Sequence, residues 1–300
     1  MSDRHVIIGS GPVGRATAAA LRERGAEVVL ASRSGRPDTT AVDATDPEAL
    51  TRLTEGAVAV YNCVNPPSYD VWPQVWPPVA AGLLAAAERT GAVLVTAGNL
   101  YPYGPVTDGV MREGMPDAAT TTKARLRAAM TRDAFDLHAS GRIRTVEVRG
   151  SDYMGAPMGD NAHIPRVVPR ALQGKSVTVI GSAHQPHTWT DVRDMGAALA
   201  LLATEESSWG RIWHAPSNPP RTQAQAVNDV LASVGEGPVK VRALPTRMLG
   251  LLAPFVPVMG ELRETAYQFT APYVMDSSAI TEAYGLEPSP WEDVCRRTVG

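Results

Sequence analysis

The sequence contains few of the residues that stabilise proteins through covalent cross-links or metal ions. Its 300 residues include two cysteines, Cys63 and Cys295, and neither has a spacing typical of metal ligands. Two isolated cysteines provide no disulfide framework, and this low usage is typical of a reducing compartment. We therefore expect no disulfide, no metal site and a cytoplasmic location.

The sequence also lacks a strong charge of one sign and a long uninterrupted apolar run. A net charge of −3 and a pI of about 6.1 give no electrostatic basis for binding nucleic acid or an anionic membrane. The apolar stretch 243–259 is broken by three prolines and Arg247. We expect a buried helix pair there rather than a membrane span; a membrane-surface or dimer contact is the alternative. Because the chain enters a strand at Arg4, we expect no signal peptide.

What is present is the composition of a globular protein and one distinctive turn. Hydrophobic residues make up 44% of the chain and charged residues 20%, which suits one or two domains. An apolar run, Arg4–Ile8, precedes a helical segment that ends at Arg24. Between them lies a glycine turn that matches the G-x-G-x-x-G pattern, formed by Gly9, Ser10, Gly11, Pro12, Val13 and Gly14. This strand–turn–helix order predicts binding of a dinucleotide pyrophosphate at the helix N-terminus.

The end of the second predicted strand, 27–31, bears on the choice of cofactor. An NAD site usually has a carboxylate here that binds the ribose hydroxyls. This chain has Ser32, Arg33 and Arg36 instead, and guanidinium groups can bind a 2′-phosphate. We therefore favour NADP(H) over NAD(H), with a solvated basic turn as the alternative. Asp43 follows a third predicted strand, 40–42. It either accepts a hydrogen bond from the adenine amino group or has only a structural role in a turn.

Further strands at 58–62, 92–96 and 142–149 alternate with helices that begin near Pro47, Gln74 and Thr121. This alternation predicts an α/β fold with a doubly wound parallel sheet. We expect a dinucleotide-binding Rossmann domain over 1–150, with a later strand–helix return near 187–215. Residues 151–300 are expected to form mainly a substrate-binding domain, with helices near 164–173, 223–234 and 245–253.

Polar and aromatic residues gather after the fourth and fifth strands, where open α/β sheets bind ligands. Asn65 follows the fourth strand and is expected near the cofactor, whereas Cys63 is expected to be a packed hydrophobe. Tyr69, Trp72 and Trp76 either line an apolar substrate cleft or anchor the next helix. At the end of the fifth strand, four residues are expected beside the nicotinamide: Thr96, Asn99, Tyr101 and Tyr103. Lys123 opposes the dipole of its helix, which suggests that it has a ligand.

Four segments resemble the short-chain dehydrogenase/reductase superfamily in its extended and atypical branch, the NAD-dependent epimerase/dehydratase family. They are the glycine turn, 99–105, 123–125 and 149–155, and the stretch 187–194 is similar to the family's return into the sheet. The resemblance implies a Rossmann domain, a bound nicotinamide nucleotide and a C-terminal substrate domain. It also implies that Lys123 binds the nicotinamide ribose, and that a homodimer would form through the helices near 74–89 and 121–139; a monomer is the alternative.

The sequence departs from that family at the proton donor. The family has a tyrosine four residues before the lysine, and here that position is Ala119. The family also has a serine or threonine four residues before the tyrosine of the turn. Counting back from Tyr103 gives Asn99, and counting back from Tyr101 gives Ala97. General acid catalysis typically contributes about 10²–10⁴-fold. The substitutes are Tyr101, Tyr103, Thr96 or Asn99, a water, or a polar group of the substrate.

Three functions are compatible with these residues. The leading hypothesis is an NADPH-dependent ketoreductase that acts on a bulky, apolar, oxygenated small molecule. Aromatic residues expected at strand ends would contact this substrate: Tyr69, Trp72, Trp76, Tyr153 and Trp189. The second is a sugar-nucleotide epimerase or dehydratase, against which Ala119 argues. The third is a protein that senses NADP(H) without turnover.

Overall fold

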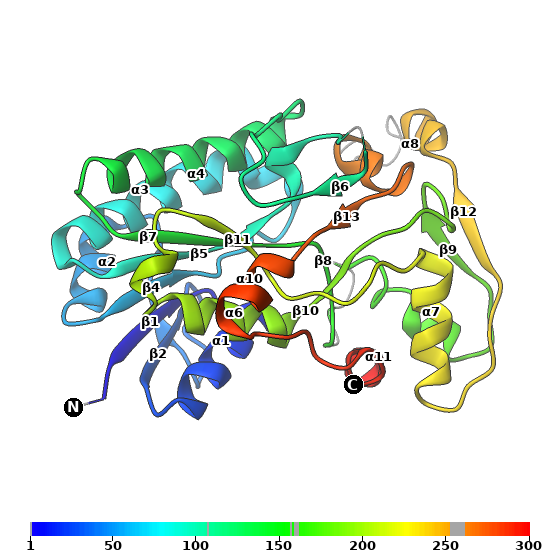
Figure 1. Ribbon diagram of the computed structural model, residues 1–300, viewed down its shortest axis with the longest axis horizontal. Helices are drawn as coiled ribbons and strands as arrows, with labels where there is room; N and C mark the ends of the chain where they lie inside the picture. The colour runs from blue at the N-terminus through cyan, green and yellow to red at the C-terminus, as the bar shows by residue number, and fades with distance from the viewer. Residues whose placement is uncertain (1, 107, 157, 159–161, 253–261) are drawn as a thin grey trace. The chain divides into compact units, whose positions relative to one another are not determined.

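The computed structural model describes residues 2–106, 108–156, 158, 162–252 and 262–300 (Figure 1). The chain forms two compact units, and each of them is built from three separate segments. The first unit comprises residues 1–102, 123–149 and 195–215. The second comprises 103–122, 150–194 and 216–300.

The first unit is built on a seven-stranded sheet with the strand order β11-β7-β5-β4-β1-β2-β3. The strands are β1 (Arg4–Ile8), β2 (Glu27–Ser32), β3 (Thr40–Ala41), β4 (Ala59–Asn62), β5 (Val93–Asn99), β7 (Thr145–Gly150) and β11 (Ile212–His214). β1 pairs in parallel with β2 on one side and with β4 on the other. The predicted doubly wound sheet is thereby confirmed, and its order reverses between β1 and β4, where such sheets bind ligands.

Helices cover both faces of this sheet: α1 (Pro12–Glu23), α2 (Pro47–Thr54), α3 (Trp72–Thr90), α4 (Thr122–Ala139) and α6 (Val192–Leu202). Figure 1 shows α3 and α4 on one face and α1 and α6 on the other. A Cβ on Gly196 of α6 would lie 2.6 Å from the backbone of Ala16, so only glycine permits this approach to α1. The predicted cap of α2 is also confirmed, because the Asp46 carboxylate accepts hydrogen bonds from the N–H groups of Glu48 and Ala49.

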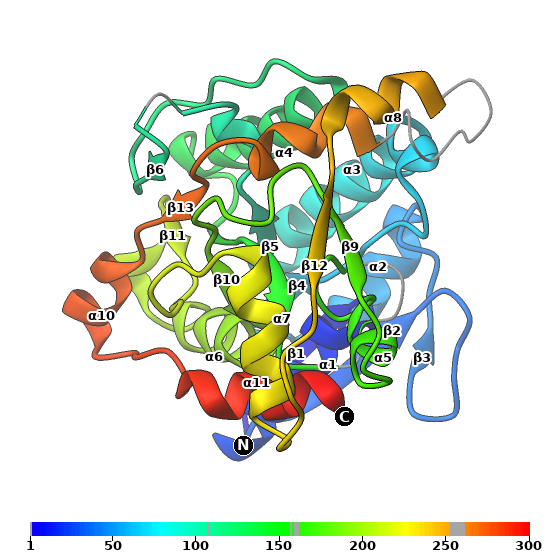
Figure 2. The same cartoon turned by 90° about the vertical axis from the view of Figure 1, so that its right-hand side faces the viewer.

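The second unit contains three short parallel strand pairs: β8 (Asp152–Met154) with β10 (Trp189–Asp191), β9 (Val177–Ile180) with β12 (Val241–Leu244), and β6 (Val110–Met111) with β13 (Val274–Met275). Its helices are α5 (Val168–Ala171), α7 (Gln223–Ala232), α8 (Thr246–Leu252), α10 (Ser278–Tyr284) and α11 (Trp291–Val299). Figure 2 shows β9 and β12 side by side, next to α7. A buried apolar cluster that includes Trp189, Val230 and Phe269 forms the core.

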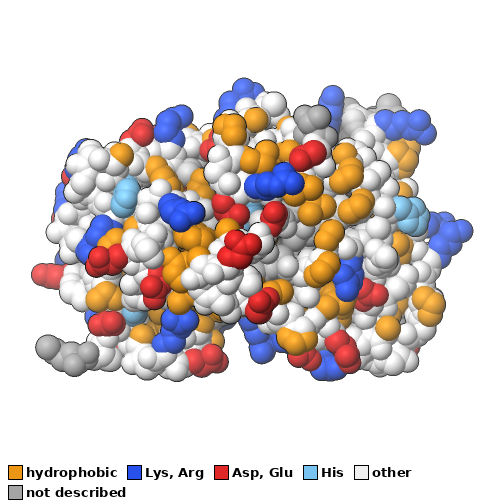
Figure 3. Space-filling model, in the orientation of Figure 1, with side chains coloured by type: hydrophobic (Ala, Val, Ile, Leu, Met, Phe, Trp, Pro, Cys, Tyr) orange, Lys and Arg blue, Asp and Glu red, His pale blue; other side chains and the backbone are white. Residues whose placement is uncertain are grey.

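One helix predicted in the second unit needs correction, and another is confirmed over its described residues. The helix expected over 164–173 is reduced to Val168–Ala171, because prolines at 165 and 169 interrupt the backbone hydrogen bonding. The helix expected over 245–253 is α8, Thr246–Leu252, and the rest of the apolar stretch, 253–259, lies outside the described residues. Within the ranges that the structure describes, no helix has both the length and the apolarity to cross a bilayer. On the face shown in Figure 3, acidic and basic side chains are interspersed.

Candidate functional site

The glycine turn is held against the loop that follows β4. Gly9 has a φ of +113°, and a Cβ there would lie 2.2 Å from the carbonyl oxygen of Cys63. A Cβ on Gly14 would lie 1.9 Å from the carbonyl oxygen of Gly9. Packing within the protein therefore requires glycine at both positions.

Gly11 differs from these two glycines. A Cβ at this position would have no heavy atom within 4 Å, so nothing in the described chain demands glycine there. Gly11 is also the N-cap of α1 and, because it has no side chain, it makes no capping hydrogen bond to the first turn of that helix. Open space at an uncapped helix N-terminus fits the pyrophosphate of a dinucleotide.

Cys63 packs beneath the glycine turn. Its side chain lies 3.4 Å from the position of a Cβ on Gly14, and its Sγ lies 4.0 Å from the hydroxyl of Thr17. Burial raises the pKa of the Cys63 thiol to about 12, which agrees with a packed hydrophobe rather than a nucleophile. Asn65, in the same loop, is exposed, and its cofactor role stays a prediction.

The end of β2 carries the groups expected around the adenosine. The Ser32 hydroxyl lies 3.0 Å from the Thr39 hydroxyl, and Arg33 and Arg36 are exposed. Asp43 accepts hydrogen bonds from the N–H and the hydroxyl of Thr45, and these bonds, with the charge of Arg33, lower the pKa of its carboxyl group. That arrangement is the structural turn considered for Asp43.

A cluster of two tyrosines and one lysine forms where β5 ends and α4 begins. The hydroxyl oxygens of Tyr69 and Tyr101 are 2.7 Å apart, although the residues are separated by 32 positions. The Lys123 ammonium lies 5.1 Å from the centre of the Tyr69 ring. Tyr101 and Lys123 are 9% and 4% exposed. We call these three residues the tyrosine–lysine cluster.

Trp72 packs against this cluster. Its ring centre is 5.0 Å from that of Tyr69 and 6.2 Å from that of Tyr101, and Trp76 meets it edge-on at 5.9 Å. Both tryptophans are buried, which agrees with the helix-anchoring alternative. The substrate role of Tyr69 and Trp72 stays a prediction.

The other residues predicted beside the nicotinamide have different surroundings. The Asn99 side chain accepts a hydrogen bond from the backbone N–H of Tyr101 and so orients the turn 101–103. Tyr103 is buried and belongs to a segment of the second unit. A residue four positions before Lys123 would lie one helical turn from it if the helix were continuous. Helix α4 begins at Thr122, however, so Ala119 lies outside the helix and this geometry does not apply to it.

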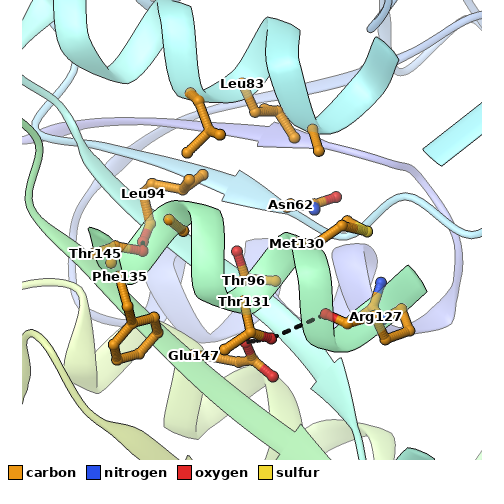
Figure 4. Close-up of a pocket in the computed structure, with 13 residues that line it drawn as sticks. Asn62, Leu83, Leu94, Thr96, Arg127, Met130, Thr131, Phe135, Thr145 and Glu147 are labelled. Carbon is orange, nitrogen blue, oxygen red and sulfur yellow. Dashed lines mark hydrogen bonds between the residues drawn. The ribbon is translucent and has the colours of Figure 1, made fainter. Parts of the chain in front are cut away.

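Thr96 points into a small pocket between the sheet and the helices α3 and α4 (Figure 4). Thr131 and Glu147 lie close to it there, and the pocket volume of about 20 Å³ has room for about one water molecule. Arg127 borders the pocket and donates a hydrogen bond of 2.8 Å to the carbonyl of Ala97.

A buried ion pair at the end of β7 completes this region, and sequence reasoning missed it. The Glu147 carboxylate accepts hydrogen bonds of 2.9 Å from Arg149 and 2.6 Å from Thr131. A Cβ on Gly98 would lie 2.5 Å from the same carboxylate. The ion pair therefore sits directly against β5, just before the turn that carries Tyr101. The available sequence signal was the presence of two opposite charges, Glu147 and Arg149, two residues apart in a buried strand.

The second unit contains the remaining predicted substrate residues. Trp189 is 2% exposed, belongs to the apolar core and donates a hydrogen bond to the carbonyl of Arg221. That placement gives it a packing role, and its contact with substrate stays a prediction. Tyr153 lies on β8, and its hydroxyl lies 3.1 Å from the position of a Cβ on Gly150.

A group of titratable residues in the second unit was also missed. The carboxylate of Asp152 lies 2.7 Å from Nε2 of His187 and 3.6 Å from that of His163. Burial lowers the pKa of His163 to about 4. Burial opposes ionisation of Asp152, but His163, His187 and Arg166 lower its pKa. No sequence pattern signals this group, because its members come from distant segments. No cluster of three or more His, Cys, Asp or Glu side chains suited to a metal ion occurs among the described residues.

Comparison with known proteins matches residues 6–214 to the model of the NAD dependent epimerase/dehydratase family. The chain belongs to this family. The matched region contains the glycine turn, the tyrosine–lysine cluster, six complete strands of the sheet and the last three residues of β1. No match was found among curated proteins.

Solved structures with the same fold include enzymes of several kinds. UDP-glucose 4-epimerase from Thermus thermophilus, in complex with NAD, has a TM-score of 0.77 at 20% identity, with 99% of this chain and 97% of that chain covered. dTDP-glucose 4,6-dehydratase from Bacillus anthracis, in complex with NAD, has a TM-score of 0.77 at 15% identity, with 99% of this chain and 96% of that chain covered. RMD from Pseudomonas aeruginosa, complexed with NADPH, has a TM-score of 0.75 at 15% identity, with 99% of this chain and 98% of that chain covered. At these identities, the likeness concerns the fold.

Proposed function

We propose that this protein is an NADPH-dependent ketoreductase that transfers hydride to a ketone of a bulky, apolar, oxygenated small molecule. The observation that carries the proposal is the buried Lys123 ammonium over the ring of Tyr69, whose hydroxyl pairs with that of Tyr101. The same chain has open space at Gly11 of its glycine turn. Reduction of a ketone requires a positioned carbonyl, stabilisation of the developing alkoxide and a proton. The cluster presents a cation and hydroxyl donors in one place.

Each part of the first unit has a proposed task. The glycine turn and the N-terminus of α1 bind the pyrophosphate, and Lys123 binds the hydroxyls of the nicotinamide ribose. A bound nicotinamide supplies the hydride. Tyr69 and Trp72 bind the apolar part of the substrate, while a substrate role of Tyr153 and of the core residue Trp189 stays a prediction for the second unit. Both cysteines are free and buried, which suits the reducing cytoplasm that we propose as the location.

The preference for NADP(H) rests on the end of β2. Arg33 and Arg36 are exposed, and Ser32 occupies the position of the usual carboxylate. Arg33→Asp is expected to weaken NADPH binding at least about tenfold and to change NADH binding much less, because only NADPH carries the 2′-phosphate. Fluorescence titration with both nucleotides measures the ratio, and Arg52→Asp on α2 controls for the change in net charge. Equal weakening of both nucleotides would contradict the assignment.

The reaction class is tested by following NADPH oxidation with a panel of aromatic ketones. Measurable NADPH binding with no oxidation by any ketone would argue against a ketoreductase. The family match supports a sugar-nucleotide epimerase or dehydratase as a second candidate. Tightly bound cofactor that copurifies, together with conversion of UDP-glucose without net consumption of NAD(P), would favour that candidate. Saturable NADP(H) binding with neither reaction would favour the sensing protein.

A further inference from the structure

The proposed reaction requires a proton donor, and the position used by the family is Ala119 in this chain. Two hydroxyl groups, 2.7 Å apart, belong to the tyrosine–lysine cluster instead, in which the Lys123 ammonium lies over the ring of Tyr69. One comes from Tyr101, after β5, and the other from Tyr69, in the turn Tyr69–Val71 that precedes α3. The Tyr69 hydroxyl belongs to a segment in which the family pattern provides no donor.

The surroundings of the two tyrosines fix their geometry. Trp72 packs against both rings, and the Asn99 side chain holds the backbone of Tyr101. The separation of 2.7 Å between the two oxygens is that of a well-formed O–H···O hydrogen bond. One phenol therefore donates to the other. Tyr69 is half-buried whereas Tyr101 is 9% exposed, so Tyr69 is the member of the pair that a ligand can reach more readily.

Lys123 supplies the electrostatic part of the arrangement. Its ammonium lies 5.1 Å from the centre of the Tyr69 ring, within the range of a cation–π contact. A positive charge this close to a phenol stabilises the phenolate that remains after proton transfer. The hydrogen bond from Tyr101 stabilises the same phenolate.

We propose that Tyr69 is the proton donor of this protein and that Tyr101, through its hydrogen bond to Tyr69, reprotonates Tyr69 after each transfer. A bound reduced nicotinamide would supply the hydride, with its electron pair, for the new C–H bond at the carbonyl carbon. The carbonyl oxygen takes the proton of the Tyr69 hydroxyl, so the ketone becomes an alcohol while the cofactor is oxidised. Tyr69 recovers its proton from Tyr101, and Tyr101 recovers one from solvent. This assignment rests on the proposed ketoreductase function.

The first test needs no substrate. The near-ultraviolet absorbance of tyrosinate is followed in a pH titration of the full chain and its variants. In the wild type, one phenolate is expected at least about one pH unit below the main tyrosine transition. That early phenolate is lost in Tyr69→Phe and moves into the main transition in Lys123→Met. Tyr284→Phe, a change on α10, reduces the main transition and retains the early one. A wild-type titration without an early phenolate, or its retention in Tyr69→Phe, would overturn the proposal.

The second test uses NADPH and phenanthrenequinone. Tyr69→Phe is expected to lower kcat about a hundredfold and to leave the NADPH dissociation constant unchanged. Tyr101→Phe lowers kcat less, because solvent can replace the relay. A Tyr69→Phe variant with wild-type kcat would refute the donor role. If the wild type binds NADPH without oxidising it, the ketoreductase function fails, while the tyrosinate titration still decides whether Tyr69 and Lys123 are coupled.

Discussion

Gly9, Gly11 and Gly14 occur in one short motif, but different constraints act on them. At Gly9 and Gly14, a methyl group would collide with backbone atoms of the protein itself. At Gly11, a methyl group would stand in open space. The motif therefore combines two glycines that packing within the protein requires and one, Gly11, that we propose is required by the ligand.

This difference predicts opposite behaviour of two similar variants. Gly14→Ala is expected to destabilise the protein by about 2 kcal/mol or more, because the strand and helix must move apart. Gly11→Ala should change the unfolding free energy by less than about 0.5 kcal/mol and weaken NADPH binding at least about tenfold, because the methyl group occupies the space of the pyrophosphate. Denaturant unfolding and fluorescence titration measure the two effects. Wild-type NADPH affinity in Gly11→Ala would show that the pyrophosphate lies elsewhere.

Asp194 gives a second prediction for a single residue. Burial raises the pKa of its carboxyl group to about 6, although Ser289 donates two hydrogen bonds to it. The folded state therefore favours the protonated form, and the stability that this group contributes is present below about pH 4 and lost as the pH rises to about 6. Relative to the wild type, Asp194→Asn should gain up to about 3 kcal/mol of unfolding free energy between these pH values. Urea unfolding of both proteins across that pH range measures the difference in unfolding free energy, variant minus wild type. A difference that falls with rising pH would contradict burial as the cause of the raised pKa.

At the scale of secondary-structure elements, the buried Glu147–Arg149 pair links β7, β5 and α4. Glu147→Gln removes the buried carboxylate that pairs with the Arg149 guanidinium, so the unfolding free energy should fall by about 3–5 kcal/mol. Glu88→Gln is a suitable control, because Glu88 forms an ion pair with Arg142 at the surface. That change should cost less than about 1 kcal/mol. Similar losses for both variants would mean that burial does not set the strength of the inner pair.

The elements that could be predicted from sequence are those with local signals. The glycine turn, the strands that flank it and the Asp46 cap are each encoded within a few neighbouring residues. The strand pairs of the second unit could not be predicted, because each strand has two to four residues and its partner lies far along the chain, as with β6 and β13. Such pairs are set by tertiary packing rather than by an alternating pattern.

The candidate site shows the same limit. Lys123 and Tyr101 could be identified from their positions at the ends of predicted elements. The contact between Tyr69 and Tyr101 could not, because Tyr69 comes from a different loop. Counting four residues back from Lys123 assumes a continuous helix, and α4 starts too late for that assumption.

At the scale of the whole molecule, the chain passes between the two units after residues 102, 122, 149, 194 and 215. The first unit is therefore incomplete in residues 1–150. That fragment lacks β11, which pairs with β7, and the part of α6 that packs on α1.

A truncation experiment follows from this organisation. Residues 1–150 alone should aggregate, because the edge of β7 and the outer face of α1 are uncovered. Joining 192–215 to this fragment through a Gly/Ser linker should restore a soluble protein with cooperative unfolding. Gel filtration and circular dichroism compare the two fragments. A monomeric, folded 1–150 fragment would show that the return segment is dispensable.

The repeated passage of the chain between the units also has a consequence for recombination and for engineering. A substrate-binding part that is one continuous stretch can be exchanged between genes by a single crossover at each end. Here, the three segments of the second unit would have to be replaced together, while the return strand and helix between them stay in place. New substrate ranges in this architecture are therefore reached more readily by point substitutions and loop insertions than by exchange of whole domains.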